Sequence, residues 1–156
     1  MGHSNIKKLW DGAQDLVNLK RLDLSWSEQL MELPDFSRAR NLEEVVLTDC
    51  ESLHSVHPSI LSLQSLVLLV VFGCGKLESL ESETHLESLS YLGVSHCKNL
   101  KKFCLSSKKL ENICLFECRE VERLHLLPFG GFTELRGLYI DDGGSLSAFQ
   151  YESYVA

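Results

Sequence analysis

Histidines and cysteines that lie close together along the chain are the first residues that could do chemistry, because both side chains bind zinc. His54 and His57 follow Cys50, and His96 precedes Cys97. Zinc needs ligands that converge on it in a tetrahedron. Neighbouring residues of an extended segment point to opposite faces, so His96 and Cys97 do not converge on one ion. We therefore expect no metal site in this chain.

The stretch Gly73-Cys-Gly75-Lys76 partly matches a phosphate-binding loop. That motif also needs a glycine at position 70 and Ser or Thr after the lysine, where this chain has Val70 and Leu77. The GxSxG motif of hydrolases and the HExxH motif of zinc proteases are both missing from the sequence. We therefore predict no catalytic residue, no cofactor-binding residue and no cofactor in this chain, and we predict that it is not an enzyme.

A repeated spacing of leucines explains where these residues lie. The pattern LxxLxLxx(C/S/G)xxLxx(L/V/F) fits the chain six times, in copies that start at Leu19, Leu42, Leu66, Leu89, Leu110 and Leu135. Successive starts are 23, 24, 23, 21 and 25 residues apart. These lengths lie within the range of leucine-rich repeats.

Each copy of the pattern predicts one strand followed by a turn. Side chains two residues apart in a strand share a face, so Leu22 and Leu24 of the first copy both point inward. The small residue three places later enters the turn, and its column reads Ser27, Cys50, Cys74, Cys97, Cys118 and Gly143. Four of the six cysteines therefore belong to the packing of the repeats and not to a disulfide framework. Because one repeat cannot bury its own apolar face, neighbouring repeats must stack.

The predicted fold is an α/β repeat protein, a leucine-rich-repeat solenoid. We expect a horseshoe segment with a parallel sheet on the concave face and irregular or short helical segments on the convex face. Residues 19–149 hold the six repeats, and residues 150–156 form a tail. Residues 1–18 are interpreted as a truncated first repeat whose strand is missing, because Ile6 and Leu9 align with Leu30 and Leu33 of the next repeat.

The outward positions of the predicted strands define the concave face, and many of them are apolar in the middle repeats. Apolar side chains that face solvent in a cluster indicate a binding surface. The candidate protein-binding residues are Val46, Leu68, Val70, Phe72, Tyr91, Phe116 and Tyr139. Three occupants stay open at this point: a separate protein ligand, a neighbouring domain of the same protein, or none, with strand propensity alone explaining the residues.

Charge and composition narrow the classes of partner. The formal net charge of -7 argues against nucleic acid, since phosphate contacts need clustered Lys and Arg. The longest apolar run, 66–72, is far too short to span a membrane. A core with free thiols and an N-terminus without a secretory signal favour a reducing compartment, so we expect a cytoplasmic, or nucleocytoplasmic, protein.

Residues that bracket the repeats resemble one family. Four stretches carry the resemblance: His3-Ser-Asn-Ile-Lys-Lys-Leu-Trp10, Leu33-Pro-Asp-Phe-Ser37, Asn41-Leu-Glu-Glu44 and Val56-His-Pro-Ser-Ile60. In combination they are similar to the leucine-rich-repeat region of plant TIR-type nucleotide-binding disease-resistance proteins, which are intracellular immune receptors. The resemblance is close over residues 3 to about 66 and looser to about 149.

The resemblance implies a protein-recognition and autoregulatory module in defence signalling. In such receptors the repeats sense a pathogen effector or a guarded host protein, and they pack on the nucleotide-binding domain. The family binds ADP or ATP in that domain, which this chain lacks. The alternative is a regulatory repeat region of a different intracellular enzyme whose catalytic domain is absent here.

Overall fold

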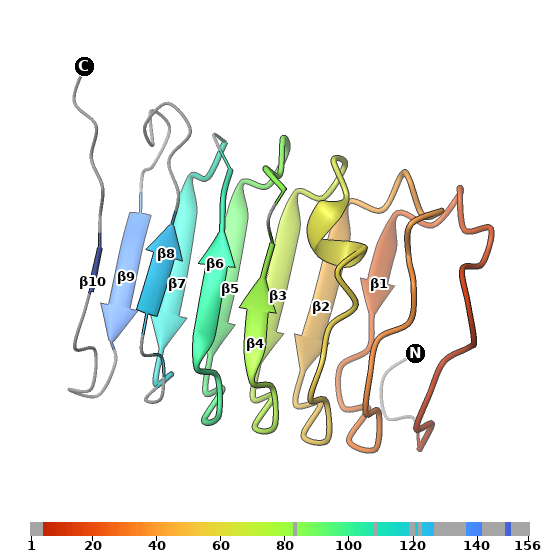
Figure 1. Ribbon diagram of the computed structural model, residues 1–156, viewed down its shortest axis with the longest axis horizontal. Helices are drawn as coiled ribbons and strands as arrows, with labels where there is room; N and C mark the ends of the chain where they lie inside the picture. Colours follow the sequence, from red (N-terminus) through yellow and green to blue (C-terminus); the bar gives the residue numbers. More distant parts are fainter. Residues whose placement is uncertain are drawn as a thin grey trace.

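The computed structural model describes residues 5–82, 84–107, 109–118 and 121, together with the backbone of the strands at 123–126, 137–141 and 149–150. Short parallel strands follow one another along the long axis of the molecule, and loops of similar size join them at both ends (Figure 1). The chain thus winds as a solenoid in which each turn adds one strand to the larger layer and, from the third turn onward, one strand to the smaller layer as well.

The larger layer is a parallel sheet of six strands. Its order is β1 (Arg21–Asp23), β2 (Glu44–Thr48), β3 (Leu68–Phe72), β5 (Tyr91–Ser95), β7 (Asn112–Phe116) and β9 (Gly137–Asp141). Each strand comes from one copy of the leucine pattern, and buried residues alternate with less buried ones along β2, β3, β5 and β7. The predicted solenoid of the leucine-rich-repeat type is therefore confirmed.

The opposite layer is a second parallel sheet. It contains β4 (Ser79–Glu81), β6 (Lys102–Leu105), β8 (Arg123–Leu126) and β10 (Phe149–Gln150), in the order β10-β8-β6-β4. In the described part of the chain the one helical element is the 3-10 turn η1 (Ile60–Ser62). The sequence predicted irregular or short helical segments on this side. Short strands form there because the return path is brief and extended, with Leu80 and Phe103 as its buried residues.

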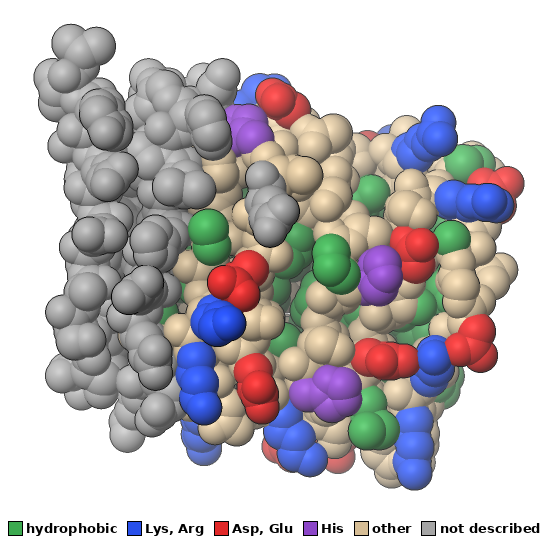
Figure 2. Space-filling model, viewed as in Figure 1, with side chains coloured by type: hydrophobic (Ala, Val, Ile, Leu, Met, Phe, Trp, Pro, Cys, Tyr) green, Lys and Arg blue, Asp and Glu red, His purple; other side chains and the backbone are tan. Residues whose placement is uncertain are grey.

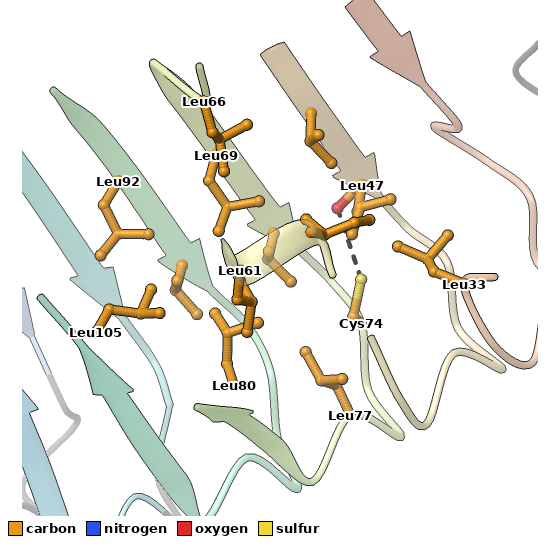
Figure 3. Packing of buried hydrophobic residues seen from close by; sticks show 14 of the residues in the cluster. Leu33, Leu47, Leu61, Leu66, Leu69, Cys74, Leu77, Leu80, Leu92 and Leu105 are labelled. Carbon is orange, nitrogen blue, oxygen red and sulfur yellow. Dashed lines mark hydrogen bonds between the residues drawn. The ribbon is translucent and has the colours of Figure 1, made fainter. Parts of the chain in front are cut away.

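The core fills the space between the two sheets. Figure 3 shows Leu47, Leu69 and Leu92 of the large sheet opposite Leu80 and Leu105 of the second sheet, with Leu61 of η1 beside them. None of these side chains is more than 2% exposed. Each fully buried leucine contributes on the order of 1.5–3 kcal/mol, so the stability of the solenoid is the sum over many stacked repeats.

The column of cysteines lines one edge of this core. Cys50, Cys74, Cys97 and Cys118 are buried, and all six cysteines, which lie in the described part of the chain, are free. The Cys74 thiol donates to the Leu47 carbonyl at 3.5 Å, as the dashed line in Figure 3 shows. Contact with the Cys50 thiol and burial raise the pKa of Cys74 above its usual range. These thiols serve packing, as the sequence predicted.

The residue just before this column has an unusual backbone in every described repeat. The φ angles are positive at Trp26 (64°), Asp49 (51°), Gly73 (65°), His96 (56°) and Glu117 (48°). The peptide N–H groups of the first four donate to Thr48, Phe72, Ser95 and Phe116 of the next strand at 2.7–2.9 Å. We call these five residues the turn row. The left-handed conformation extends each strand pairing into the turn, at a steric cost of about 1–2 kcal/mol for a residue other than glycine.

Among the described residues, no helix is long and apolar enough to cross a membrane.

Candidate functional site

The outer face of the six-stranded sheet is where the sequence placed its candidate residues, and we call it the large-sheet face. Pairing of the strands aligns its outward residues in three rows. The first row is Arg21, Glu44, Leu68, Tyr91, Asn112 and Gly137, the second is Asp23, Val46, Val70, Gly93, Cys114 and Tyr139, and the third includes Thr48, Phe72, Ser95, Phe116 and Asp141. The seven candidate residues that the sequence predicted belong to these rows.

Strand β3 is the apolar centre of this face, since all three of its outward residues are apolar. Leu68 and Val70 are partly buried, whereas the Phe72 side chain is 37% exposed. Phe116, two strands away in the same row, is 38% exposed. Val46 on β2 adds a partly buried apolar side chain beside Val70. An apolar surface therefore continues across the middle of the sheet.

The side chain of Tyr91 lies along the sheet. A Cβ atom at Gly93 would come 3.2 Å from the Tyr91 ring, so the ring covers this glycine. The Tyr91 hydroxyl reaches the Cys114 sulfur at 4.0 Å on the next strand. Burial raises the pKa of Tyr91, and the Cys114 thiol adds to the rise. A larger residue at position 93 would therefore require the Tyr91 ring to shift by a few tenths of an ångström.

Phe72 also has an aromatic neighbour, His96 of the turn row. The two ring centroids are 4.7 Å apart, with the planes inclined at 40°. His96 Nε2 lies 3.5 Å from a carboxylate oxygen of Glu117, and its Nδ1 is buried without a hydrogen-bond partner in the described structure. Phe72, His96 and Glu117 thus form a continuous edge to the apolar centre.

On β1 and β2, at the N-terminal end of the large-sheet face, charged side chains take the place of aromatic ones. The Arg21 guanidinium lies 3.1 Å from Glu44 and 3.6 Å from Asp23. Asp23 in turn accepts hydrogen bonds from the hydroxyl and the N–H of Ser25, at 2.7 and 3.1 Å. These two hydrogen bonds hold the pKa of Asp23 below its usual range, with Arg21 adding to the shift. The charges at this end are therefore already paired within the chain.

The structure brings the predicted residues Val46, Leu68, Val70, Phe72, Tyr91 and Phe116 together on one face. Tyr139 belongs to β9 and pairs in register with Cys114, but its side chain lies outside the described residues. Their role in binding stays a prediction.

Two aromatic residues of the turn row lie beside the candidate residues but were not predicted from the sequence to belong to this face. Trp26 is 45% exposed at the edge of the face, and His96 packs on Phe72. The signal that could have found them is their common position, one residue before the small-residue column. Within the described residues, no group of three His, Cys, Asp or Glu side chains could hold a metal ion.

A hollow lies on the side of the molecule that carries η1, β4 and β6. Its walls are Pro58, Ser62, Glu81, Ser82, Thr84 and Cys104. The Ser82 and Thr84 hydroxyls donate to the Leu61 carbonyl at 2.6 and 3.2 Å, so they are already engaged. Burial and the Glu81 carboxylate raise the pKa of Cys104, which keeps this thiol protonated and a weak nucleophile. This hollow offers no activated group for catalysis.

The sequence is similar to those of plant disease-resistance proteins. No family model matches the chain. A stretch of 103 residues, 66% of the chain, is 45% identical to Disease resistance protein RPP4 of Arabidopsis thaliana. The TMV resistance protein N of Nicotiana glutinosa is 37% identical over 100 residues, and Disease resistance protein RPP2A of Arabidopsis thaliana is 37% identical over 115 residues.

These matches cover only a small part of each relative. The matched stretch spans 9% of RPP4, of the N protein and of RPP2A. What the whole relatives do is therefore not carried over to this chain by identity alone.

Proposed function

We propose, on the premise that this chain is a leucine-rich-repeat relative of the TIR-type plant disease-resistance proteins, that it is a protein-recognition module in plant defence. Its ligand is a pathogen effector or a guarded host protein, bound on the large-sheet face. The same surface contacts the nucleotide-binding domain of the receptor in the resting state. The chain acts in the cytoplasm, where its free thiols stay reduced.

The observation that carries this proposal is the apolar centre of the large-sheet face. Outward strand positions meet solvent, yet Leu68, Val70 and Phe72 of β3 are all apolar, and Tyr91 and Phe116 continue the patch. Contiguous apolar and aromatic surface on a folded domain marks a site that another protein covers. Buried aromatic anchors dominate the energy of such interfaces.

Recognition, and not catalysis, is the activity proposed for this chain. Binding on a preformed sheet needs no cofactor, and the proposed exchange of ADP for ATP belongs to another domain of the receptor. The described residues support this, because the free thiols of the cysteine column are engaged with backbone carbonyls and Cys104 is held protonated.

The experiment replaces the two aromatic residues at the centre of the patch. The double variant Phe72→Ser/Tyr91→Ser should lose the proteins that the wild-type chain captures from plant extract, measured by quantitative mass spectrometry. Truncating an interface hot spot costs about 2 kcal/mol or more of binding free energy. We therefore expect the double variant to bind its partner at least about thirtyfold more weakly than the wild type does.

The matched control is Met31→Ser, which changes a side chain that is 45% exposed but lies outside the three rows of the face. It should capture the same proteins as the wild type. Both variants should unfold cooperatively in urea, which separates lost binding from lost structure. An identical set of captured proteins for all three chains would refute the proposal.

A further inference from the structure

The large-sheet face carries more negative than positive side chains among its described residues. Among the described residues of the three rows and the turn row, Arg21 is the one Lys or Arg side chain. The same set holds four carboxylates: Asp23, Glu44, Asp49 and Glu117. Because Arg21 already pairs with Asp23 and Glu44, it neutralises neither of the other two. The face therefore presents excess negative charge to a partner.

The two remaining carboxylates lie on either side of the apolar centre. Asp49 follows β2 and Glu117 follows β7, while Phe72 and His96 at the ends of β3 and β5 lie between them. With strands about 4.8 Å apart, the two carboxylate-bearing residues are separated by three strand spacings, about 14 Å. Asp49 forms no ion pair with any described residue, and the carboxylate of Glu117 has His96 beside it at 3.5 Å.

The opposite side of the molecule has a different distribution of charge. Figure 2 shows the side that carries η1, β4 and β6, where Lys and Arg side chains are interspersed with Asp and Glu. Outside the large-sheet face, Lys8 contacts Asp11 at 2.6 Å and Glu32 at 3.0 Å. The combination of an apolar centre with more carboxylates than Lys and Arg side chains is therefore a property of the large-sheet face and not of the whole acidic chain.

We infer that the partner presents a basic side chain between apolar ones, with an arginine stacked over Phe72 and directed to Glu117 or Asp49. This inference rests on the proposed function of the face. A guanidinium can stack on an exposed phenyl ring and donate paired hydrogen bonds to a carboxylate at the same time. Lysine satisfies the charge but forms the stacked, bidentate contact less well. A neutral apolar partner leaves the Asp49 carboxylate without a counterpart as water is expelled, and it leaves His96 as the one group beside the Glu117 carboxylate among the described residues.

The test uses a defined probe because the natural ligand is unidentified. Four acetylated eight-residue peptides share a central Leu-X-Leu and differ only at X, which is Arg, Lys, neutral citrulline or Glu. Their affinities for the 156-residue chain are measured by NMR titration at about 50 and 300 mM NaCl. We expect the Arg peptide to bind about tenfold tighter than the citrulline peptide, the Glu peptide to bind weakest, and added salt to weaken the Arg peptide.

Two double variants test whether the preference for the Arg peptide arises on the large-sheet face. Asp49→Asn/Glu117→Gln should reduce the affinity of the Arg peptide to that of the citrulline peptide, and asparagine at 49 tolerates the left-handed backbone. The control Glu78→Gln/Glu87→Gln removes two exposed carboxylates outside the face and should change nothing.

Two outcomes would overturn the inference. In the first, the Arg and citrulline peptides bind equally or none of the four binds, which means that the face does not select its partner by charge. Loss of capture in Phe72→Ser/Tyr91→Ser would still support the proposed function in that case. If Arg is preferred but Asp49→Asn/Glu117→Gln makes no difference, the preference arises elsewhere on the molecule. Loss of both the peptide preference and the dependence on Phe72 and Tyr91 would remove the proposed function as well.

Discussion

At the scale of single residues, the turn row shows how one backbone conformation recurs without a common side chain. Its members are Trp, Asp, Gly, His and Glu, and all have positive φ. The N–H groups of the first four extend the pairing between neighbouring strands, so the conformation is imposed by the sheet and not by residue preference. For this reason the positions of Trp26 and His96 at the edge of the candidate site could not be predicted from residue type.

Gly73 is the member of this row where two features disfavour a side chain. Its φ is +65°, and a Cβ there would collide with the Asp49 carboxylate. We predict that Gly73→Ala lowers the free energy of unfolding by about 1–3 kcal/mol, measured by urea unfolding.

The neighbouring Gly75 supplies the control for this prediction. It has no heavy atom within 4 Å of an added Cβ, and its φ is not positive. Gly75→Ala should therefore leave the free energy of unfolding nearly unchanged. Adding Asp49→Gly to Gly73→Ala should restore the part of the lost unfolding free energy that is due to the contact with the Asp49 carboxylate. Equal losses from Gly73→Ala and Gly75→Ala would mean that the conformation of the turn row has been misjudged.

At the scale of elements, the strands of the large sheet were predictable and those of the second sheet were not. The leucine pattern sets two inward residues in each strand of the large sheet, so these six strands and their register follow from one repeated spacing. A strand such as β4 has three residues with Leu80 alone buried. One buried residue has no period, so the sequence could not tell a short strand from an irregular or helical segment.

Hydrogen exchange can test the second sheet directly. The Ser82 and Leu86 amides donate to the Cys104 and Ser106 carbonyls of the next repeat, both at 2.8 Å. We predict that these two amides exchange slowly, close to the rate of amides in β3 and β5, because opening them disrupts the stack. The exposed amide of Lys76 should exchange at the rate of a loop. Loop-like exchange at Ser82 and Leu86 would contradict a paired second sheet.

At the scale of the whole molecule, two sheets enclose one continuous core and leave one outer face apolar at its centre. Its rows could be predicted, because strand periodicity determines which residues point outward. The position of the Tyr91 side chain, which extends over Gly93 to Cys114, could not be predicted, because it depends on a glycine on one strand and a thiol on the next. The solenoid thus positions the described aromatic side chains of this face through contacts within the sheet.

Photo-crosslinking in plant cells tests most directly whether the large-sheet face is the binding surface. A benzophenone amino acid replaces Phe72 on the face in one variant and Met31 outside it in another; both positions are exposed, at 37% and 45%. The account predicts that light produces a covalent adduct with a partner protein from position 72 and none from position 31. An adduct from position 31 together with none from position 72 would contradict it.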